Sequence, residues 1–143
     1  MNTTRHTPEN IIALEPNEIF VFGSNVDGIH GAGAARDARE RFGAQYGIAE
    51  GLTGRCYAIP TVDFKLKRYG KRYPLQKVED SIHRFITYCR SHEELTFLLT
   101  PIGCGLAGFT ESEIAGIFSE HISEIPENII FPKSFLDIIL GEK

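Results

Sequence analysis

Residues Phe20 to Phe42 read FVFGSNVDGIHGAGAARDARERF, an apolar run followed by a glycine-rich loop and an alanine- and arginine-rich segment. Residues Phe97 to Phe118 read FLLTPIGCGLAGFTESEIAGIF and repeat that order. A short run of consecutive apolar, β-prone residues is typical of a strand that is buried on both faces of a sheet. Each stretch therefore predicts a strand, a loop and a helix in turn, and two such units indicate an α/β fold.

The rest of the chain predicts further strands and helices around these two units. Apolar residues recur at spacings of three and four from Leu75 to Ser91, which is typical of an amphipathic helix. Strands that alternate with helices favour a three-layer α/β/α sandwich with a mixed central sheet, and the length fits a single domain over residues 1–143. We expect strands at Glu18–Gly23, Cys56–Ile59, Leu95–Thr100 and Asn128–Phe131, and helices at Gly33–Phe42, Leu75–Ser91, Glu111–Ile122 and Ser134–Leu140.

Local signals predict where several elements begin and end. Gly43 follows the first helix and is expected to end it. Thr110 and Glu113 have the spacing of a capping box, and Ser134 is expected to cap the last helix. Pro60 is expected to close the second strand because proline has no N–H to donate, and Gly51 to Gly54 is expected to be a turn that opens it.

The composition restricts the kinds of partner. The formal net charge is −4, so we expect any anion to be drawn by a local site rather than by the whole surface. The three cysteines lack a Cys-x-x-Cys pair and the histidines lack metal-ligand spacing, so neither a disulfide framework nor a metal site is expected. No apolar run reaches the roughly 18 residues of a membrane helix, and the N-terminus has no apolar signal segment. We therefore expect a cytoplasmic protein with no membrane partner.

The two glycine-rich loops are candidate anion sites. Glycine lets backbone N–H groups approach a ligand, and a helix that starts beside the loop adds its own unpaired N–H groups and positive dipole end. Ligands of open α/β sheets bind beyond the carboxyl ends of the strands, where both loops lie, so the two loops can hold two linked phosphates between them. The alternative is that these glycines serve only tight turns and helix ends. Neither loop completes the fingerprint of a dinucleotide-binding dehydrogenase or of a nucleoside-triphosphatase loop.

These segments resemble the macrodomains, a family that binds ADP-ribose and in several branches hydrolyses ADP-ribosyl linkages. The resemblance spans roughly Ile19 to Phe131. FVFGSN followed by GAGAA is similar to the family's first strand, asparagine-containing loop and glycine-rich turn, and LTGRCYAIPT is similar to its middle segment. The sequence IGCGL at Ile102 to Leu106 repeats the phosphate loop of the terminal ADP-ribose glycohydrolase branch.

The resemblance implies a set of contacts to ADP-ribose or a related NAD-derived diphosphate. It implies Asn25 near the distal ribose, Gly31 and Gly33 in the first phosphate loop, and the residues after Ile102 around the diphosphate. No cofactor is implied. The expected ligand-binding residues are Gly23, Ser24, Asn25, Gly31, Ala32, Gly33, Thr53, Ile102, Gly103, Cys104, Gly105, Leu106, Ala107, Gly108 and Phe109.

This chain differs from the glycohydrolase branch at the positions that carry the catalytic residues of that branch. That branch keeps an aspartate where this chain has Ala107, and a lysine just after the middle strand, where the nearest lysine here is Lys65, displaced by a few residues. The family's Gly-Asp-Ile pattern that holds adenine is also missing. The candidate catalytic residues are Asn25, Asp27 and His30 of the first loop, where an acid or a histidine can orient a water molecule. The alternative is that Asp27 belongs to an ordinary turn and that His30 merely lies near a helix start.

Two other functions fit the same loops. One is a non-catalytic reader of ADP-ribosylated protein or nucleic acid, which the missing acid at Ala107 favours. The other is a Cys104-dependent hydrolase, because a helix N-terminus lowers the pKa of a nearby thiol. The alternative for Cys104 is a small buried side chain between two glycines.

The segment from Asp63 to Pro74 is expected to be a polar and basic connection. Its basic and aromatic residues can bind nucleic acid by charge and stacking. It can also be a solvated loop, or a loop that folds over the ligand. The candidate nucleic-acid contacts are Lys65, Lys67, Arg68, Lys71 and Arg72, with Tyr69 and Tyr73 interleaved.

Overall fold

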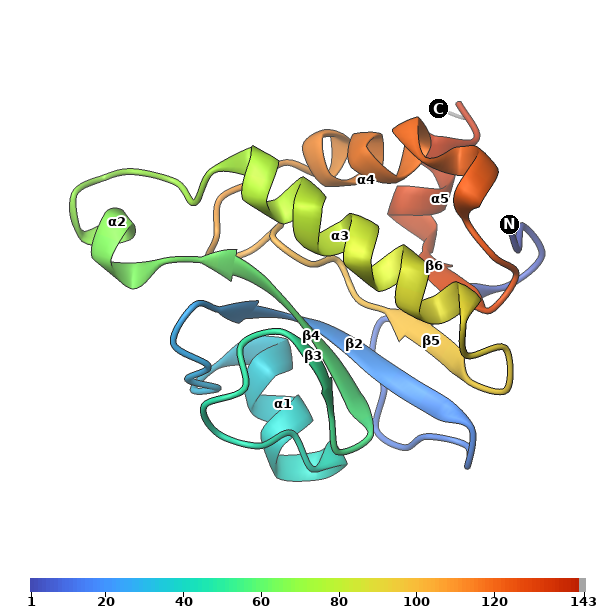
Figure 1. The fold of residues 1–143 in the computed structure, drawn as a ribbon, viewed down its shortest axis with the longest axis horizontal. Helices are drawn as coiled ribbons and strands as arrows, with labels where there is room; N and C mark the ends of the chain where they lie inside the picture. Colours follow the sequence, from blue (N-terminus) through green and yellow to red (C-terminus); the bar gives the residue numbers. More distant parts are fainter. Residues whose placement is uncertain (142–143) are drawn as a thin grey trace.

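A computed structural model describes residues 1–141 of the protein, in which strands and helices alternate along the chain (Figure 1). In chain order the elements are β1 (His6–Thr7), β2 (Glu18–Asn25), α1 (Gly33–Phe42), β3 (Gly51–Thr53), β4 (Cys56–Val62), α2 (Phe64–Arg68), α3 (Leu75–Arg90), β5 (Thr96–Leu99), α4 (Glu111–Glu120), the short 3-10 helix η1 (Ile122–Glu124), β6 (Ile129–Pro132) and α5 (Lys133–Ile139).

The strands form one mixed sheet in the order β1-β6-β5-β2-β4-β3. Strands β1, β6, β5, β2 and β4 run parallel to their neighbours, and β3 pairs antiparallel with β4 at one edge. The predicted α/β fold with a mixed sheet is confirmed. Because β2, β4 and β5 are parallel, their carboxyl ends lie at the same edge of the sheet, where the two glycine-rich loops begin.

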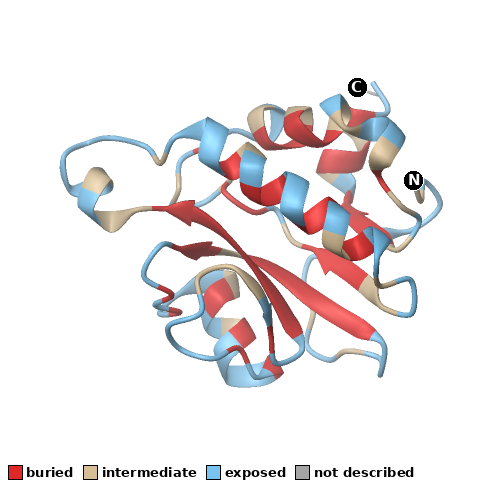
Figure 2. Cartoon of the chain, in the orientation of Figure 1, coloured by how far each residue is buried: buried red, intermediate tan, exposed pale blue. Residues whose placement is uncertain are grey.

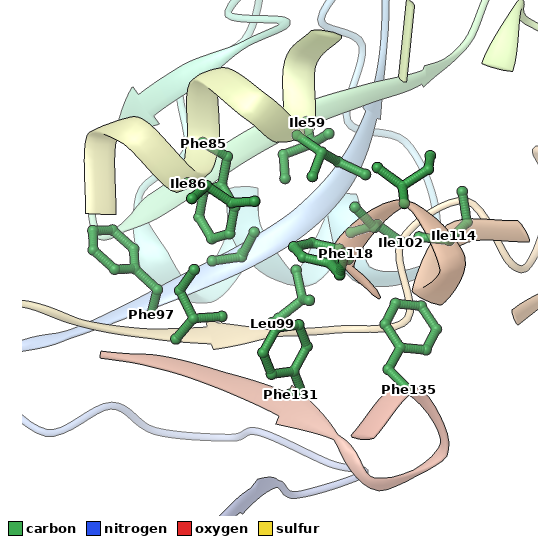
Figure 3. Packing of buried hydrophobic residues seen from close by; sticks show 14 of the residues in the cluster. Ile59, Phe85, Ile86, Phe97, Leu99, Ile102, Ile114, Phe118, Phe131 and Phe135 are labelled. Atoms are coloured by element: carbon green, nitrogen blue, oxygen red, sulfur yellow. The ribbon is translucent and has the colours of Figure 1, made fainter. Parts of the chain in front are cut away.

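Helices cover both faces of the sheet because side chains alternate along each strand. On one face, Phe20 and Phe22 of β2 pack with Ala38 and Phe42 of α1. On the other face, Val21 belongs to a larger cluster that includes α3, α4 and α5. Figure 2 shows the central strands buried along most of their length, and Figure 3 shows the larger cluster between sheet and helices. Aromatic and branched side chains dominate that cluster, including Ile59, Phe85, Phe97, Leu99, Phe118, Phe131 and Phe135.

The predicted starts of α1, α3 and α4 are confirmed, whereas the helix predicted to reach Ile122 ends at Glu120. Helix α1 has the predicted bounds, and Gly43 ends it in the left-handed conformation at φ 80°. The capping box at the start of α4 is present in both directions between Thr110 and Glu113. The prediction that Ser134 caps the last helix is wrong, because α5 begins at Lys133 directly after β6, with Pro132 preceding it at φ −58°.

Two predictions for the second strand are also wrong. Pro60 does not close it, since β4 continues to Val62. The partner strand β3 pairs only as far as Ala58, so Pro60 lies where the β3 side of β4 is open and a missing N–H costs no ladder bond. The predicted turn at Gly51 to Gly54 is mostly strand, because β3 occupies Gly51–Thr53 and the reversal follows at Gly54, where φ is 58°.

The 3-10 helix η1, strand β1 and helix α2 were not predicted. Strand β1 contains only two residues and depends on its pairing with β6, so it carries no periodic signal. Helix α2 is a single turn within the segment expected to be a connection, and the Asp63 side chain caps it by accepting a hydrogen bond from the Lys65 N–H. In Figure 1, α2 lies just beyond the carboxyl end of β4. Within residues 1–141, no helix combines the length and apolar character needed to cross a membrane.

Candidate functional site

The two glycine-rich loops meet in one cleft at the carboxyl ends of β2, β4 and β5. The cleft has a volume of about 590 Å³. We call it the central cleft. Its lining residues are Gly23, Ser24, Asn25, Ile29, Gly31, Ala32, Gly33, Ala34, Ala35, Thr61, Val62, Phe64, Thr100, Pro101, Ile102, Gly103, Cys104, Gly105, Leu106, Ala107 and Glu111. Most of the predicted ligand-binding residues are therefore brought together.

The first wall of the central cleft is the N-terminus of α1. Ala32 precedes the helix in extended conformation and no side chain caps it. Within the described part of the chain, the backbone N–H groups of residues 31–35 have no acceptor, and the first helical hydrogen bond runs from the Arg36 N–H to the Ala32 carbonyl. Small residues line the cleft here, so no large side chain separates a ligand from this stretch of backbone. These N–H groups are hydrogen-bond donors at the positive end of a helix dipole.

The second wall is the loop between β5 and α4. The loop folds back on itself because the Phe109 N–H donates to the Gly103 carbonyl at 2.9 Å and the Gly108 N–H donates to the Gly105 carbonyl at 3.0 Å. Gly103 and Gly108 have φ values of 75° and 83°, which only glycine adopts without strain. In residues 1–141, no acceptor pairs with the N–H groups of residues 105–107. A row of unpaired N–H groups of this kind forms an anion-binding concavity.

A small residue at position 23 suits the close packing at the base of the central cleft. A Cβ atom on Gly23 would stand 3.3 Å from Thr61 Oγ1, 3.4 Å from the backbone nitrogen of Gly103 and 3.6 Å from Ile102 Cα. The end of β2 and the start of the second loop therefore lie close together, and a larger side chain on residue 23 would press against the second loop.

Asn25 uses its side chain to shape the first loop. Its Nδ2 donates to the Ile29 carbonyl at 2.6 Å, and its Oδ1 accepts from the N–H groups of Ile29 at 3.0 Å and Asp27 at 3.2 Å. The neighbouring Ser24 hydroxyl donates to the Ala49 carbonyl. Asn25 lies at the cleft as predicted, but its carboxamide oxygen and one of its two N–H donors bond within the loop. Its role in this conformation is to position the loop.

Several predicted site residues lie outside the central cleft. Asp27 is exposed on the loop, and Thr53 accepts a hydrogen bond from the Gln45 N–H through its Oγ1. Phe109 is buried in the core beneath the second loop, and Gly108 faces a neighbouring pocket. His30 is completely buried, with its ring edge-on to Phe22 and its Nε2 bonded to the Ile48 carbonyl at 3.2 Å. The structure therefore does not bring Asp27 or His30 to the ligand side of the loop.

Among the residues lining the central cleft, the titratable side chains are Cys104 and Glu111. Burial, together with the negative charges of Glu111 and Glu113, raises the pKa of Cys104 to about 11. Its Sγ also donates to the Ile102 carbonyl at 3.4 Å. The residues predicted for the site did not include Glu111. The signal that could have identified it is its place in the first turn of the helix that follows the second glycine-rich loop.

Basic side chains reach the second loop from α2 and the segment after it. Lys67 Nζ donates to the Leu106 carbonyl at 2.8 Å. Arg72 forms a two-pronged ion pair with Glu113, with Nη1 to Oε1 at 2.8 Å and Nη2 to Oε2 at 3.0 Å. The basic segment therefore contacts the second loop and the first turn of α4, and the three interpretations of it (nucleic-acid contact, solvated loop, or a loop that folds over the ligand) stay predictions.

In the part of the chain that the structure describes, no group of three or more His, Cys, Asp or Glu side chains is placed to hold a metal ion. Comparisons with protein-family models, with curated proteins and with solved structures found no match to this chain.

Proposed function

We propose that this protein binds ADP-ribose or a related NAD-derived diphosphate in the central cleft. The observation that carries this proposal is the pair of unpaired N–H rows, residues 31–35 and 105–107, on opposite walls of one cleft. No lysine or arginine is among the lining residues, so backbone dipoles supply the attraction for an anion. One row of N–H groups is enough to bind a single phosphate. Two opposed rows of N–H groups therefore fit two linked phosphates better.

A second cavity supports a nucleotide ligand rather than pyrophosphate alone. This side cavity has a volume of about 710 Å³ and shares Gly33, Ala34, Thr100 and Pro101 with the central cleft. Its other walls come from residues 6–12, Phe20, Leu99, the later turns of α1, Pro132 and the start of α5. The lining mixes apolar side chains such as Ile11 and Phe20 with charged ones such as Arg41, so it offers both a packing surface and hydrogen-bond partners for a base or sugar. A nucleoside joined to a diphosphate in the central cleft can extend into this cavity.

The resemblance to macrodomains agrees with this assignment. Helices on both faces of a mixed sheet fit the three-layer sandwich that the resemblance implies, and IGCGL lies in the wall of the central cleft. We also infer a cytoplasmic location, because all three cysteines have free thiols.

Two observations favour a binding protein over a hydrolase. Asp27 and His30 do not line the central cleft, and Ala107 stands where the related branch keeps an acid. The Cys104-dependent hydrolase is disfavoured, since a pKa of about 11 leaves about one thiolate in 10⁴ at pH 7. The side chains at the cleft therefore favour the second candidate function, a non-catalytic reader of ADP-ribosylated macromolecules.

Titration calorimetry with ADP-ribose, AMP, ribose 5-phosphate and pyrophosphate tests the proposal. We expect ADP-ribose to bind more tightly than each of its parts, because only the whole molecule fills both the central cleft and the side cavity. Saturating ADP-ribose, at about 100 times its Kd, should stabilise the fold by about 2.7 kcal/mol. The proposal is wrong if millimolar ADP-ribose gives neither heat nor a rise in the melting temperature.

A further inference from the structure

A small pocket with three basic side chains adjoins the central cleft. It has a volume of about 270 Å³ and is lined by Lys67, Lys71 and Arg72, with Asp63 as its acidic side chain. Thr61, Val62 and Ala107 line both this pocket and the central cleft, so the two adjoin each other. We call it the cationic pocket. It lies on the β4 side of the second loop, whereas the side cavity lies on the opposite side, against α1 and α5.

The charges of the cationic pocket leave a local excess of positive charge. Arg72 is paired with Glu113, and its guanidinium carbon also lies 4.8 Å from the centre of the Phe109 ring. Asp63 is engaged in capping α2. Lys67 bonds only to a neutral carbonyl, and within residues 1–141 Lys71 has no hydrogen-bond acceptor or ion-pair partner for its ammonium group. The Asp63 carboxylate keeps its negative charge while it caps α2, so the two ammonium groups exceed it by one positive charge, in a chain whose formal net charge is −4.

The pocket also has an exposed aromatic neighbour. Tyr69, at the end of α2, is 75% exposed, and Leu106 at the border of the central cleft is 62% exposed. Figure 1 shows α2 and the segment after it projecting beyond the sheet, and Figure 2 shows this projection as mostly exposed. Exposed aromatic rings beside lysine and arginine are typical of surfaces that stack the bases of single-stranded nucleic acid while binding its phosphates. A phosphorylated peptide would use the lysines but would leave Tyr69 without a planar partner.

We propose that the cationic pocket binds a phosphate of a single-stranded nucleic acid whose ADP-ribosyl group occupies the central cleft. This inference rests on the proposed function, because the cleft must hold the ADP-ribosyl end for the next phosphate to reach Lys67 and Lys71. The partner is thus a nucleic-acid strand that carries ADP-ribose on a terminal phosphate. The strand continues over α2, where Tyr69 stacks on a base.

The test measures the affinity of the protein for four probes. Fluorescence anisotropy uses the fluorescein-labelled form of each probe, and calorimetry uses the unlabelled form. The probes are free ADP-ribose, a single-stranded octathymidylate with ADP-ribose on its 5′-phosphate, the same strand with a bare 5′-phosphate, and an ADP-ribosylated peptide with the same number of negative charges. The proposal expects the modified strand to bind at least about tenfold more tightly than free ADP-ribose, because two linked contacts reinforce each other. The peptide should show no such gain.

The variant Lys71→Glu tests the pocket itself. This variant is expected to bind the modified strand no more tightly than free ADP-ribose. The slope of log K for strand binding against log salt concentration should become shallower by about 0.7 for each phosphate contact that is lost. The matched control is Arg90→Glu, which makes the same change in charge on the exposed last turn of α3, outside the central cleft, the side cavity and the cationic pocket. The control should keep the full gain.

The outcomes separate this inference from the proposed function. If neither free ADP-ribose nor the modified strand binds, the proposed function is wrong. If free ADP-ribose binds but the strand shows no gain, or if the gain survives Lys71→Glu, the cationic pocket does not bind the strand. An equal gain for the acidic peptide would replace a nucleic-acid partner by an acidic protein and would also overturn the proposal.

Discussion

A Cβ atom on Gly23 would stand 3.4 Å from the backbone nitrogen of Gly103, so the two glycines lie close together with room for little more than a hydrogen atom on Gly23. Gly23 ends the apolar run of β2 and Gly103 starts the loop after β5, so this close approach brings together two segments that are far apart in the sequence. Both residues line the central cleft, between the two rows of N–H groups.

The variant Gly23→Val should widen this contact. Its side chain would meet Thr61 Oγ1 and the second loop, and such overpacking is expected to cost about 1–3 kcal/mol in the free energy of unfolding. ADP-ribose affinity should fall as well, because the two walls move apart. Urea unfolding and calorimetry measure the two effects. The control Gly116→Ala lies within α4, where a Cβ meets nothing within 4 Å, and it should stabilise the protein by about 0.5–1 kcal/mol.

The variant Gly105→Glu should block the anion site while leaving the fold intact. Gly105 has no positive φ and no atom within 4 Å of a Cβ position, so substitution there causes no strain. A carboxylate beside the N–H groups of residues 105–107 would take the place of the ligand's charge, and we expect at least about a tenfold loss of ADP-ribose affinity. Gly105→Ala is the matched control and should bind nearly as well as the parent protein. If Gly105→Glu binds ADP-ribose with full affinity, the second loop is not part of the binding site.

The variant Asn25→Ala should loosen the first loop. It deletes three hydrogen bonds to Asp27 and Ile29, with an expected loss of about 1–3 kcal/mol in stability and a weaker affinity for ADP-ribose. Asp27→Ala, which removes an exposed side chain from the same loop, should change stability by less than about 0.5 kcal/mol. Thermal unfolding and calorimetry of both variants check this. Greater weakening of binding by Asp27→Ala than by Asn25→Ala would instead make Asp27 a direct contact.

The Arg72–Glu113 ion pair should make stability depend on pH in the acidic range. Hydrogen bonds from Arg72 and from the Thr110 N–H lower the pKa of Glu113 to about 2 from its ordinary value of 4.5. Because the folded pKa is depressed, this stabilisation is fully present above pH 4.5 and is lost as the pH falls toward about 2. The melting temperatures of the parent protein and of Glu113→Gln should therefore converge over this range. Glu93→Gln, at an exposed position, should show no comparable convergence.

Cys104 should react slowly with iodoacetamide at neutral pH. Its pKa of about 11 implies that the rate of alkylation rises about tenfold for each pH unit between 7 and 10. Peptide mapping by mass spectrometry at several pH values measures this, with the urea-unfolded chain as the fast-reacting reference. Complete labelling of Cys104 within minutes at pH 7 would contradict this prediction and would support the hypothesis of a Cys104-dependent hydrolase.

Much of the fold could be predicted because its signals are local. The bounds of α1, the left-handed Gly43 that ends it and the capping box of Thr110 and Glu113 all depend on neighbours within a few residues. The convergence of the two glycine-rich loops followed from parallel strands, whose carboxyl ends share one edge. Pro60 was misjudged because the cost of a proline in a strand depends on whether the adjacent strand still pairs there, which is a long-range property.

The sequence by itself determined that small residues free the backbone N–H groups at two strand ends, since glycine and alanine leave these groups accessible whatever the rest of the chain does. Only the tertiary structure decided which side chains face the cleft. It buries His30 against Phe22 and brings Lys67 to Leu106, a residue 39 positions away. These two outcomes depend on packing and hydrogen bonding between distant segments, whereas the hydrogen bonds of Asn25 to Asp27 and Ile29 are local to its loop.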